Sequence, residues 1–415
     1  MPAELFDPDS PAYAAIRPAH ATRPRLVARC RSVSDVVAAL RYAASTGERA
    51  VPRGGGHCFA GRSWRDGIVL DLSGLDGITV AERNAIIGAG ARLEQVYQAL
   101  HVHGLTLPAG CGPTVGIAGL TLGGGIGLLG RKYGLTCDRL ISAQVVLADG
   151  TVIECDRDHH PDLFWALRGA GGGQFGVVTS LRFATVPEPL TTRIEAHWTD
   201  ITLDDLVSAW QTWAPDAPDD LTVNLTLASE PGAPVRATLF GASTLPEEPT
   251  RELLQKFTTH AGIELRPNLP YHHLKRTFAD PNEPEPPQRI RSEFFAHPIS
   301  TPTLTSLLTQ LAGGRRHLTF TAMGGAYNRV AEDATAFAHR DERFLLEHVA
   351  APSDPWLDAS WTTAHTEGSG RVYPNFPDLL LDDWATAYHA GNHPRLAAVK
   401  KTYDPHRFFD FPQAI

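Results

Sequence analysis

The chain has 415 residues, of which 43% are hydrophobic and 20% are charged, and its formal net charge is -9. This composition is ordinary for a globular protein with a sizeable core, and the length predicts two domains or one large domain with an insertion. The negative charge, without a basic patch, argues against a nucleic-acid partner. The start of the chain lacks the basic and apolar parts of a signal peptide, and no apolar run approaches the roughly 20 residues of a membrane helix. We therefore expect a cytoplasmic protein with no membrane partner, and we make no prediction of its oligomeric state.

The first 185 residues predict strands and helices mixed along the chain. Apolar spacing predicts strands at 25–30, 50–52, 68–72, 85–89 and 177–183, and helices at 33–44, 93–101 and 163–167. Ser32 or Ser34 is positioned to cap the first of these helices, and Gly47 is positioned to end it. Asp149-Gly150, between two β-rich runs, predicts a hairpin with a two-residue loop. This pattern indicates an α+β fold.

Glycine-rich segments interrupt the pattern. The stretch 108–130 is almost all glycine and small or apolar residues, so we expect a buried loop against a ligand and no regular helix. Segments 125–130 and 171–176 match G-x-G-x-x-G, but neither leads from a strand through the glycines into a regular helix, which argues against a Rossmann site. With the glycines at 54–56, these clusters present backbone N–H groups to an anionic ligand such as a diphosphate. Arg53 either adds positive charge there or forms an ordinary surface ion pair.

A domain boundary is predicted at residues 187–189, Pro-Glu-Pro. The glycine clusters stop there, and strand-like and helix-like stretches continue to residue 370. We expect domains at 1–187 and 188–370, followed by a C-terminal segment at 371–415 whose helix at 382–403 is interrupted at 391–394. The proline- and acid-rich run 280–287 predicts an exposed loop.

No metal site is predicted. The five cysteines include no C-x-x-C pair, which argues against a zinc site and a disulfide framework. The motifs of zinc proteases, P-loop enzymes and penicillin-binding proteins are also absent from the sequence. Asp158, His159 and His160 are adjacent, but three neighbours on a loop rarely share one metal ion.

Four ordered motifs carry a resemblance to a known family. They are PRGGGHCFAG at 52–61, GPTVGIAGLTLGGG at 112–125, GAGGGQFGVV at 169–178 and YPNFPD at 373–378. The first three resemble FAD-linked oxidases of the vanillyl-alcohol oxidase and p-cresol methylhydroxylase (PCMH) type, and the fourth resembles the berberine-bridge-enzyme subgroup. The resemblance implies an α+β fold with a bipartite FAD-binding domain of the PCMH type, to which the C-terminal segment returns. A substrate domain of antiparallel sheet and helices would lie over the flavin.

The resemblance also implies how FAD is held. In that family the histidine of the G-G-H motif bonds the 8α-methyl carbon of the flavin, and His57 occupies this position; such a link is expected to raise the flavin's reduction potential. Many members add a cysteine bonded to flavin C6, but here Gly112 stands at that position. Cys111, one residue earlier, is then either a second link or a small buried hydrophobe. The residues predicted to contact FAD are Arg53, Gly54, Gly55, Gly56, His57, Cys58, Cys111, Gly112, Pro113, Thr114, Val115, Gly116, Gly119, Leu120, Gly123, Gly124, Gly125, Gly127, Gly176, Val177, Val178 and Asn375.

The catalytic base must depart from the family's pattern. Many relatives carry a tyrosine at the fourth position of Y-x-N-Y, where this chain has Phe376, which accepts no proton. Berberine-forming enzymes use a glutamate on a strand after G-G, and Arg329 takes that place here. We expect Tyr327 on the same strand face, with its pKa lowered by Arg329, and predict it as the base, with Arg329 as its modulator or a clamp for a substrate anion. The alternative is a tyrosine packed on the sheet beside a solvated arginine. Reserve candidates are Tyr373, His365 and Glu367.

The resemblance implies an oxidoreductase that takes hydride from a small molecule to flavin N5. The donor carbon would belong to an alcohol, an amine or an allylic group, and dioxygen would be the acceptor, giving hydrogen peroxide. Two alternatives stay open: a dehydrogenase with another acceptor, and a flavin-bearing binding or sequestration protein. A sugar, an alkaloid and an aromatic secondary metabolite all remain possible substrates.

Overall fold

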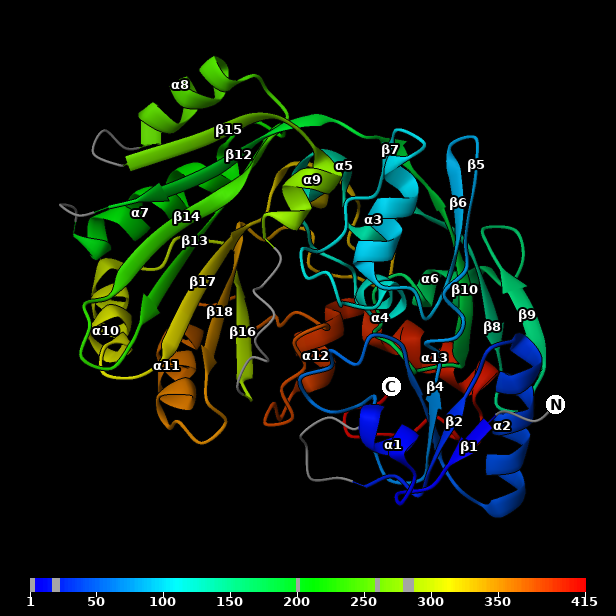
Figure 1. Ribbon diagram of the computed structural model, residues 1–415. Helices are drawn as coiled ribbons and strands as arrows, with labels where there is room; N and C mark the ends of the chain where they lie inside the picture. The colour runs from blue at the N-terminus through cyan, green and yellow to red at the C-terminus, as the bar shows by residue number, and fades with distance from the viewer. Residues whose placement is uncertain (1–3, 17–22, 199–201, 258–261, 279–286) are drawn as a thin grey trace.

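The computed structural model describes residues 4–16, 23–198, 202–257, 262–278 and 287–415. Figure 1 shows two lobes: a sheet lobe, residues 190–370, built on one large twisted sheet, and a first lobe, which contains the earlier strands and the C-terminal helices. The loop predicted at 280–287 lies outside the described residues except for Pro287. Among the described residues, no helix has both the length and the apolar character needed to cross a membrane.

Two sheets form the frame of the first lobe, and a short pair joins β11 to β7. The four-stranded sheet has the order β1-β2-β4-β3, with β2 and β3 parallel to β4. The five-stranded sheet has the antiparallel order β5-β6-β10-β8-β9. The strands are β1 (Glu4–Phe6), β2 (Leu26–Arg29), β3 (Ala50–Arg53), β4 (Ile68–Asp71), β5 (Ile78–Ala81), β6 (Asn84–Gly88), β7 (Leu105–Thr106), β8 (Leu140–Val146), β9 (Val152–Cys155), β10 (Val177–Ala184) and β11 (Val186–Pro187).

Local sequence accounts for the helices of this lobe. Ser32 caps α2: its Oγ accepts a hydrogen bond from Asp35 N at 3.2 Å, and the Asp35 carboxylate accepts one from Ser32 N at 3.0 Å. Gly47 ends the helix in the left-handed conformation, with φ of 69°. The predicted helix is thus confirmed with both of its caps. The helices before the sheet lobe are α1 (Pro11–Ile16), α2 (Val33–Thr46), α3 (Leu93–His101), α4 (Ile117–Leu122), α5 (Gly130–Tyr133), η1 (Thr136–Arg139) and α6 (Pro161–Ala166).

The prediction that 108–130 holds no regular helix was wrong, because α4 lies inside it and α5 begins at its end. Ile117, Ala118 and Leu122 of α4 are buried in the core of the first lobe. Tertiary packing stabilises short helices far more than intrinsic propensity does, so glycine content alone was misleading.

The sheet lobe consists of a seven-stranded sheet with helices on one face. Its order is β15-β12-β14-β13-β17-β18-β16, and every pairing is antiparallel. Figure 1 shows α7, α10 and α11 beside the face that points away from the first lobe. The elements are β12 (Leu190–His197), α7 (Leu203–Trp213), η2 (Ala214–Asp216), β13 (Leu221–Ser229), β14 (Arg236–Ser243), α8 (Glu247–Phe257), β15 (Gly262–Pro270), α9 (Tyr271–Arg276), β16 (Arg289–Phe295), α10 (Thr301–Leu311), β17 (Arg316–Ala322), η3 (Gly325–Arg329), β18 (Phe344–Ala350) and α11 (Trp356–His365).

Alternation along β17 and β18 separates the two faces of this sheet. Leu318, Phe320 and Leu346 point into the core beneath the helices. Their neighbours Thr319 and Glu347 line a cavity on the opposite face. Because successive side chains of a strand point to opposite faces, one pair of strands serves both the core and the cavity.

The C-terminal segment returns to the first lobe through α12 (Trp384–His389), η4 (Ala390–Asn392) and α13 (His393–Tyr403). Lys400 Nζ donates to Phe409 O at 2.7 Å and to Gln174 O, and Ile415 N donates to Gln174 Oε1 at 3.1 Å. The helix break predicted at 391–394 lies where η4 meets α13. The domain boundaries at residues 187 and 370 remain a proposal.

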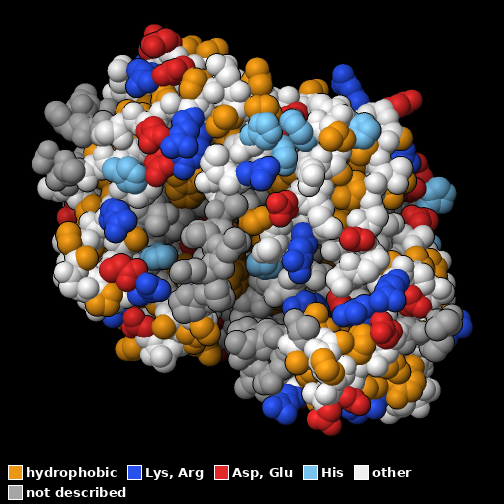
Figure 2. Space-filling model, in the orientation of Figure 1, with side chains coloured by type: hydrophobic (Ala, Val, Ile, Leu, Met, Phe, Trp, Pro, Cys, Tyr) orange, Lys and Arg blue, Asp and Glu red, His pale blue; other side chains and the backbone are white. Residues whose placement is uncertain are grey.

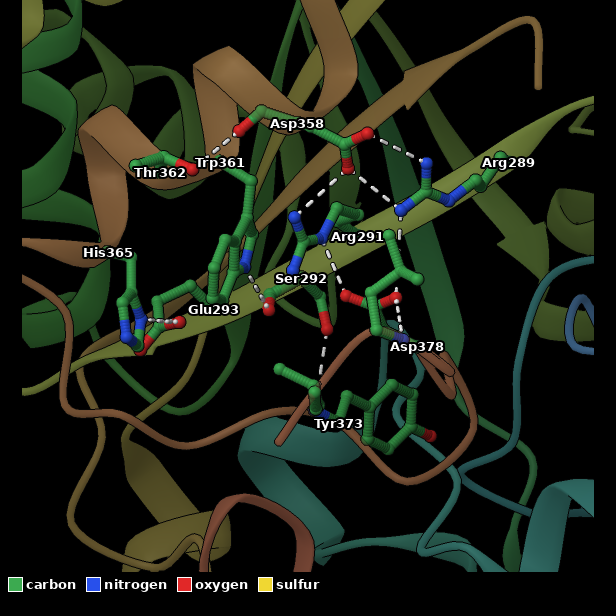
Figure 3. A network of polar contacts seen from close by, with 12 residues as sticks. Arg289, Arg291, Ser292, Glu293, Asp358, Trp361, Thr362, His365, Tyr373 and Asp378 are labelled. Atoms are coloured by element: carbon green, nitrogen blue, oxygen red, sulfur yellow. Dashed lines mark hydrogen bonds and ion pairs between the residues drawn. The ribbon is translucent and has the colours of Figure 1, made fainter. Parts of the chain in front are cut away.

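An ion network ties the C-terminal segment to edge strand β16. Figure 3 shows Arg291 between Asp358 of α11 and Asp378 of the C-terminal segment. Its Nε lies 2.6 Å from Asp378 Oδ2, and its Nη1 lies 3.0 Å from Asp358 Oδ1. The guanidinium also stacks 3.7 Å from the centre of the Trp361 ring. These contacts hold the segment that contains Tyr373 against the sheet.

Arg131 of α5 joins the two lobes from a buried position. Its Nε donates to Leu221 O at 3.0 Å, and its Nη1 donates to Pro215 O at 2.8 Å. It also donates to Met323 O and Ala217 O. All four carbonyls lie at the ends of sheet-lobe elements, so one side chain from the first lobe satisfies several backbone groups of the other.

Replacing Arg131 with Met should destabilise the protein strongly. Each buried carbonyl left without a partner costs about 1–3 kcal/mol, so we expect a total loss of at least about 3 kcal/mol. Arg329→Met is the control: this arginine is exposed, its one ion-pair partner among the described residues is Asp219, and its loss should cost no more than about 1 kcal/mol. Thermal or urea denaturation measures both variants. Equal costs would contradict the anchoring role of Arg131.

Candidate active site

A cavity of about 500 Å³ lies between the two lobes. On the first-lobe side it is lined by loops at 54–59, 110–120 and 171–173, and on the other side by the open face of the seven-stranded sheet. The loop from Tyr373 to Pro377 completes the wall. The cavity is therefore built from segments that are far apart in the sequence.

The glycines of two loops allow backbone-to-backbone contact. A Cβ atom built on Gly55 would lie 2.2 Å from Gly116 N, and one built on Gly116 would lie 2.3 Å from Gly55 N. No larger residue fits either position without separating the loops. Glycine is therefore required here by the close approach of two chain segments.

The structure brings most of the predicted contact residues to this cavity. Those that line it are Gly54, Gly55, Gly56, His57, Cys58, Cys111, Val115, Gly116, Gly119, Leu120, Gly127, Gly176, Val178 and Asn375. Those that do not are Arg53, Gly112, Pro113, Thr114, Gly123, Gly124, Gly125 and Val177. Several of the second group support the first: a Cβ on Gly123 would lie 2.2 Å from Asn375 Oδ1, for example.

His57 opens onto the cavity and is held by Thr114. Its Nε2 lies 2.9 Å from Thr114 Oγ1. Although the ring faces the cavity, desolvation by the surrounding protein, together with the positive charges of Arg92 and Arg53, lowers its pKa. The lowered pKa favours the neutral imidazole, which is the form in which it acts as a nucleophile.

Arg53 lies behind the first glycine loop. Its guanidinium is 5.7 Å from the centre of the Trp64 ring and fills the space beside Gly56. Its Nε is buried and has no hydrogen-bond partner among the described residues. A half-buried arginine with an unused donor beside glycine backbone suits an anionic ligand.

A lysine that the sequence did not indicate lies against Cys111. Lys275 Nζ donates to Cys111 Sγ at 3.1 Å and to Ala109 O at 3.2 Å, and it is buried between the rings of Tyr97 and Tyr271. Burial lowers the pKa of Lys275, whereas the neighbouring thiol raises it. Because 164 positions separate lysine and cysteine, no local pattern pointed to this pair.

The strand predicted around Tyr327 is wrong, and so is its pairing with Arg329. Both residues lie in the 3₁₀ helix η3; Tyr327 is buried, whereas Arg329 is exposed and bonded to Asp219. The Tyr327 hydroxyl donates to Gly127 O at 2.8 Å and accepts from Gly127 N at 3.1 Å. Burial raises the pKa of Tyr327, and the hydrogen bond from Gly127 only partly offsets this increase. The nearby cation that also lowers this pKa is Arg131, not the expected Arg329. The Tyr327 hydroxyl thus already donates its proton and accepts a hydrogen bond, which fits a structural role for this residue.

The hydroxyl group of Tyr373 is also held in place by hydrogen bonds. Its hydroxyl accepts from Gly125 N and Ile126 N, each at 3.1 Å, and from Asn375 Nδ2 at 3.0 Å. Burial raises its pKa to about 12. Phe376, which replaces the family's tyrosine, packs 5.0 Å from the Tyr373 ring.

The two other reserve residues lie outside the cavity wall. His365 Nδ1 is 2.8 Å from Glu293 Oε2, as Figure 3 shows, and Glu367 accepts from Ser300 N at 2.7 Å. Neither lines the cavity. Their partners indicate structural roles in the sheet lobe.

Glu347 is the acidic residue that the sequence analysis missed. It stands on β18, lines the cavity and faces the glycine loops, with Thr321 Oγ1 donating to its Oε1 at 3.4 Å. Burial raises its pKa to about 7, and the threonine hydrogen bond only partly offsets this. The sequence does show Glu347 as the single acidic residue in the apolar run Phe344–Ala350. Only the fold shows which face of the sheet this side chain occupies.

Comparison with known proteins agrees with this geometry. A family model described as FAD binding domain matches residues 24–156, and one described as berberine and berberine like matches 372–415. YgaK of Bacillus subtilis, described as an uncharacterized FAD-linked oxidoreductase, is 34% identical, covering 94% of this chain and 91% of that protein. Chitooligosaccharide oxidase of Gibberella zeae is 30% identical, covering 94% and 87%. The solved structure of wild-type BBE-like 1 of Physcomitrella patens has a TM-score of 0.91 at 27% identity, covering 100% and 96%.

The chain belongs to the berberine-bridge-enzyme-like family of FAD-linked oxidoreductases. This confirms the predicted family, the PCMH-type fold and FAD as the cofactor. The residues present fit that cofactor, because glycine backbone lines part of one wall of the cavity, and the Arg53 Nε, which has no hydrogen-bond partner among the described residues, lies beside Gly56.

Replacing Gly116 with Ala should separate the two glycine loops and reduce the incorporation of FAD. Overpacking of this kind costs about 1–3 kcal/mol, and we expect the purified variant to carry much less flavin than the natural protein. Gly77→Ala is the control, because a Cβ there meets no atom within 4 Å. The ratio of flavin to protein absorbance measures the effect. Full flavin content in the Gly116 variant would contradict the close contact of the loops.

Proposed function

We propose that this protein is an oxidase that converts an alcohol carbon of a hydroxylated small molecule into a carbonyl, with Glu347 as the base. The observation that carries the proposal is the Glu347 carboxyl group on the cavity wall opposite the glycine loops. FAD, held by the glycine loops and His57, would supply the hydride acceptor, and dioxygen would take the two electrons to give hydrogen peroxide.

Glu347 is suited to remove the hydroxyl proton. As the substrate C–H bond gives up its hydride, the O–H proton moves to a carboxylate oxygen, and the carbonyl forms. A base is most effective when its pKa lies near the working pH, and the Glu347 pKa of about 7 meets this condition. Both tyrosines of the cavity have raised pKa values and engaged hydroxyls, so neither competes for this role.

Polar side chains around Glu347 suit a substrate with several hydroxyl groups. Thr222, Asn224, Thr319 and Thr321 line the same wall. Hydroxyl and amide groups of this kind fix the orientation of a polar ligand in an otherwise apolar pocket. The relative named chitooligosaccharide oxidase supports oligosaccharides as the first compounds to test.

We further propose that His57 carries the flavin covalently. A neutral imidazole on a glycine loop is available to form the bond, and Thr114 holds the ring in one orientation. Cys111, whose Sγ accepts a hydrogen bond from Lys275, is the candidate for a second covalent link to the flavin.

The tether is tested by denaturing the yellow protein in acid and filtering it. Flavin should stay with the chain in the natural protein and in Cys111→Ala, and it should pass into the filtrate from His57→Ala. Retention in His57→Ala but not in the double variant would assign a second link to Cys111. Free flavin from the natural protein would refute the tether.

Glu347→Gln tests the base. We expect kcat to fall about 10²–10⁴-fold with little change in KM, because the amide retains the size but not the basicity. In the natural enzyme kcat/KM should rise with pH through about 7, as the carboxylate forms, and this rise should be absent from the variant. Glu342→Gln is the matched control: burial also raises its pKa to about 7, but it lies outside the cavity wall. An unchanged rate and pH profile in Glu347→Gln would exclude the role.

The raised pKa also predicts a stability effect that does not depend on turnover. Since the folded state binds the Glu347 proton more tightly than the unfolded state, this contribution is complete below about pH 4.5 and is lost as pH rises through about 7. Relative to Glu347→Gln, the natural protein should therefore lose thermal stability between these values. A constant difference would contradict the pKa shift.

The substrate class and the acceptor are tested together. Sugars and oligosaccharides, benzylic alcohols and allylic alcohols are each mixed anaerobically with the enzyme, and loss of flavin absorbance identifies the donor. Rapid recovery of colour in air, with hydrogen peroxide released, is the expected result. Reduced flavin that persists in air would indicate a dehydrogenase, and tight binding without loss of colour a binding protein.

A further inference from the structure

Three histidines meet where α9 of the sheet lobe packs on α3 of the first lobe. His101 is the last residue of α3, and His272 and His273 lie in the first turn of α9. Figure 2 shows histidine side chains gathered on the surface above these two helices. We call these three residues the histidine cluster.

The rings of the histidine cluster form a compact triangle. The ring centres are 4.9 Å apart for His101 and His272, 5.2 Å for His101 and His273, and 5.4 Å for the two α9 residues. One nitrogen from each ring lies within 4.8 Å of the other two. Ligands of a tetrahedral metal ion with bonds of about 2.1 Å lie about 3.4 Å apart, so modest side-chain rotations close the set.

Glu188 holds the cluster from behind. Its Oε2 is 2.6 Å from His101 Nδ1, and its Oε1 accepts from His272 N at 2.7 Å. The carboxylate is nearly buried, with 7% of its side chain exposed. A carboxylate on one ring nitrogen fixes the tautomer and directs the other nitrogen toward a metal ion.

His272 has an unused nitrogen in a buried position. The residue is only 8% exposed, and its Nδ1 has no hydrogen-bond partner among the described residues. Buried polar atoms are rarely left unsatisfied, and this nitrogen is free to bind a ligand. His273 is exposed, which leaves the cluster open to solvent on one side.

We propose that the histidine cluster binds one divalent transition-metal ion with a preference for imidazole, such as Zn²⁺, outside the active site. Three neutral imidazoles supply three ligands, and water supplies the fourth. The Glu188 carboxylate orients His101 and offsets part of the ion's charge. Because the ligands come from both lobes, the ion joins α3 to α9.

The site is connected to the cavity through α9. Lys275, on the same short helix, donates to Cys111 Sγ in the cavity wall and to Ala109 O next to that wall. Tyr271 and Leu274 pack in the core of the first lobe. A metal ion at the start of α9 therefore fixes the helix that positions Lys275 against the cavity.

Titration of the flavin-loaded protein with Zn²⁺, by calorimetry, tests the proposal. The protein is prepared without a histidine tag, stripped with EDTA and dialysed. We expect one tightly bound equivalent, weakened at least about tenfold in His101→Ala, His273→Ala and Glu188→Gln. His103→Ala is the control, because this exposed histidine on the same turn lies outside the cluster. Zn²⁺ should raise the melting temperature of the natural protein and of the control, but not of His273→Ala.

Cu²⁺ provides a second readout that does not depend on affinity. The electron paramagnetic resonance spectrum of the natural protein should show coupling to the nitrogens of three imidazoles, and His273→Ala should show fewer. Failure to bind Zn²⁺, or binding that survives unchanged in both His101→Ala and His273→Ala, would overturn the proposal.

Discussion

The cavity depends on the way Arg131 holds the seven-stranded sheet against the glycine loops. Its guanidinium satisfies four buried carbonyls at the ends of sheet-lobe elements, so the two lobes meet in one relative position. The ion network at Arg291 fixes the C-terminal wall in a similar way. Buried charge is costly unless its hydrogen bonds are complete, and this makes the arrangement specific.

The two walls of the cavity carry different chemistry. The first-lobe wall combines glycine backbone with apolar side chains, and the half-buried Arg53 and the buried Lys275 lie beside it. The sheet wall presents a carboxyl group among threonine and asparagine side chains. An anionic cofactor suits the first wall and a hydroxylated substrate suits the second. The missing tyrosine at Phe376 is then consistent with a base that stands on the sheet.

The fold of the first lobe was predictable because its signals are local. The Ser32 cap, the Gly47 end and the hairpin at Asp149-Gly150 each act within a few residues, and each is found, although the hairpin loop is 148–150 and not the two residues predicted. The errors came where packing overrides local preference: α4 forms within a glycine-rich stretch, and the run around Tyr327 folds into a 3₁₀ helix. The second error placed Tyr327 beside Arg329, whereas the structure buries Tyr327 and leaves Arg329 exposed with Asp219.

The sequence by itself determined the family, the cofactor and the glycine loops, because glycine runs encode close backbone approach directly in the order of residues. Only the tertiary structure decided which groups meet at a distance. Lys275 contacts Cys111, and His101 lies beside His272 and His273, although these residues are far apart in the sequence. Glu347 faces a cavity whose other wall comes from distant loops. Strand alternation in a folded sheet, and the packing of one lobe on the other, place these groups together.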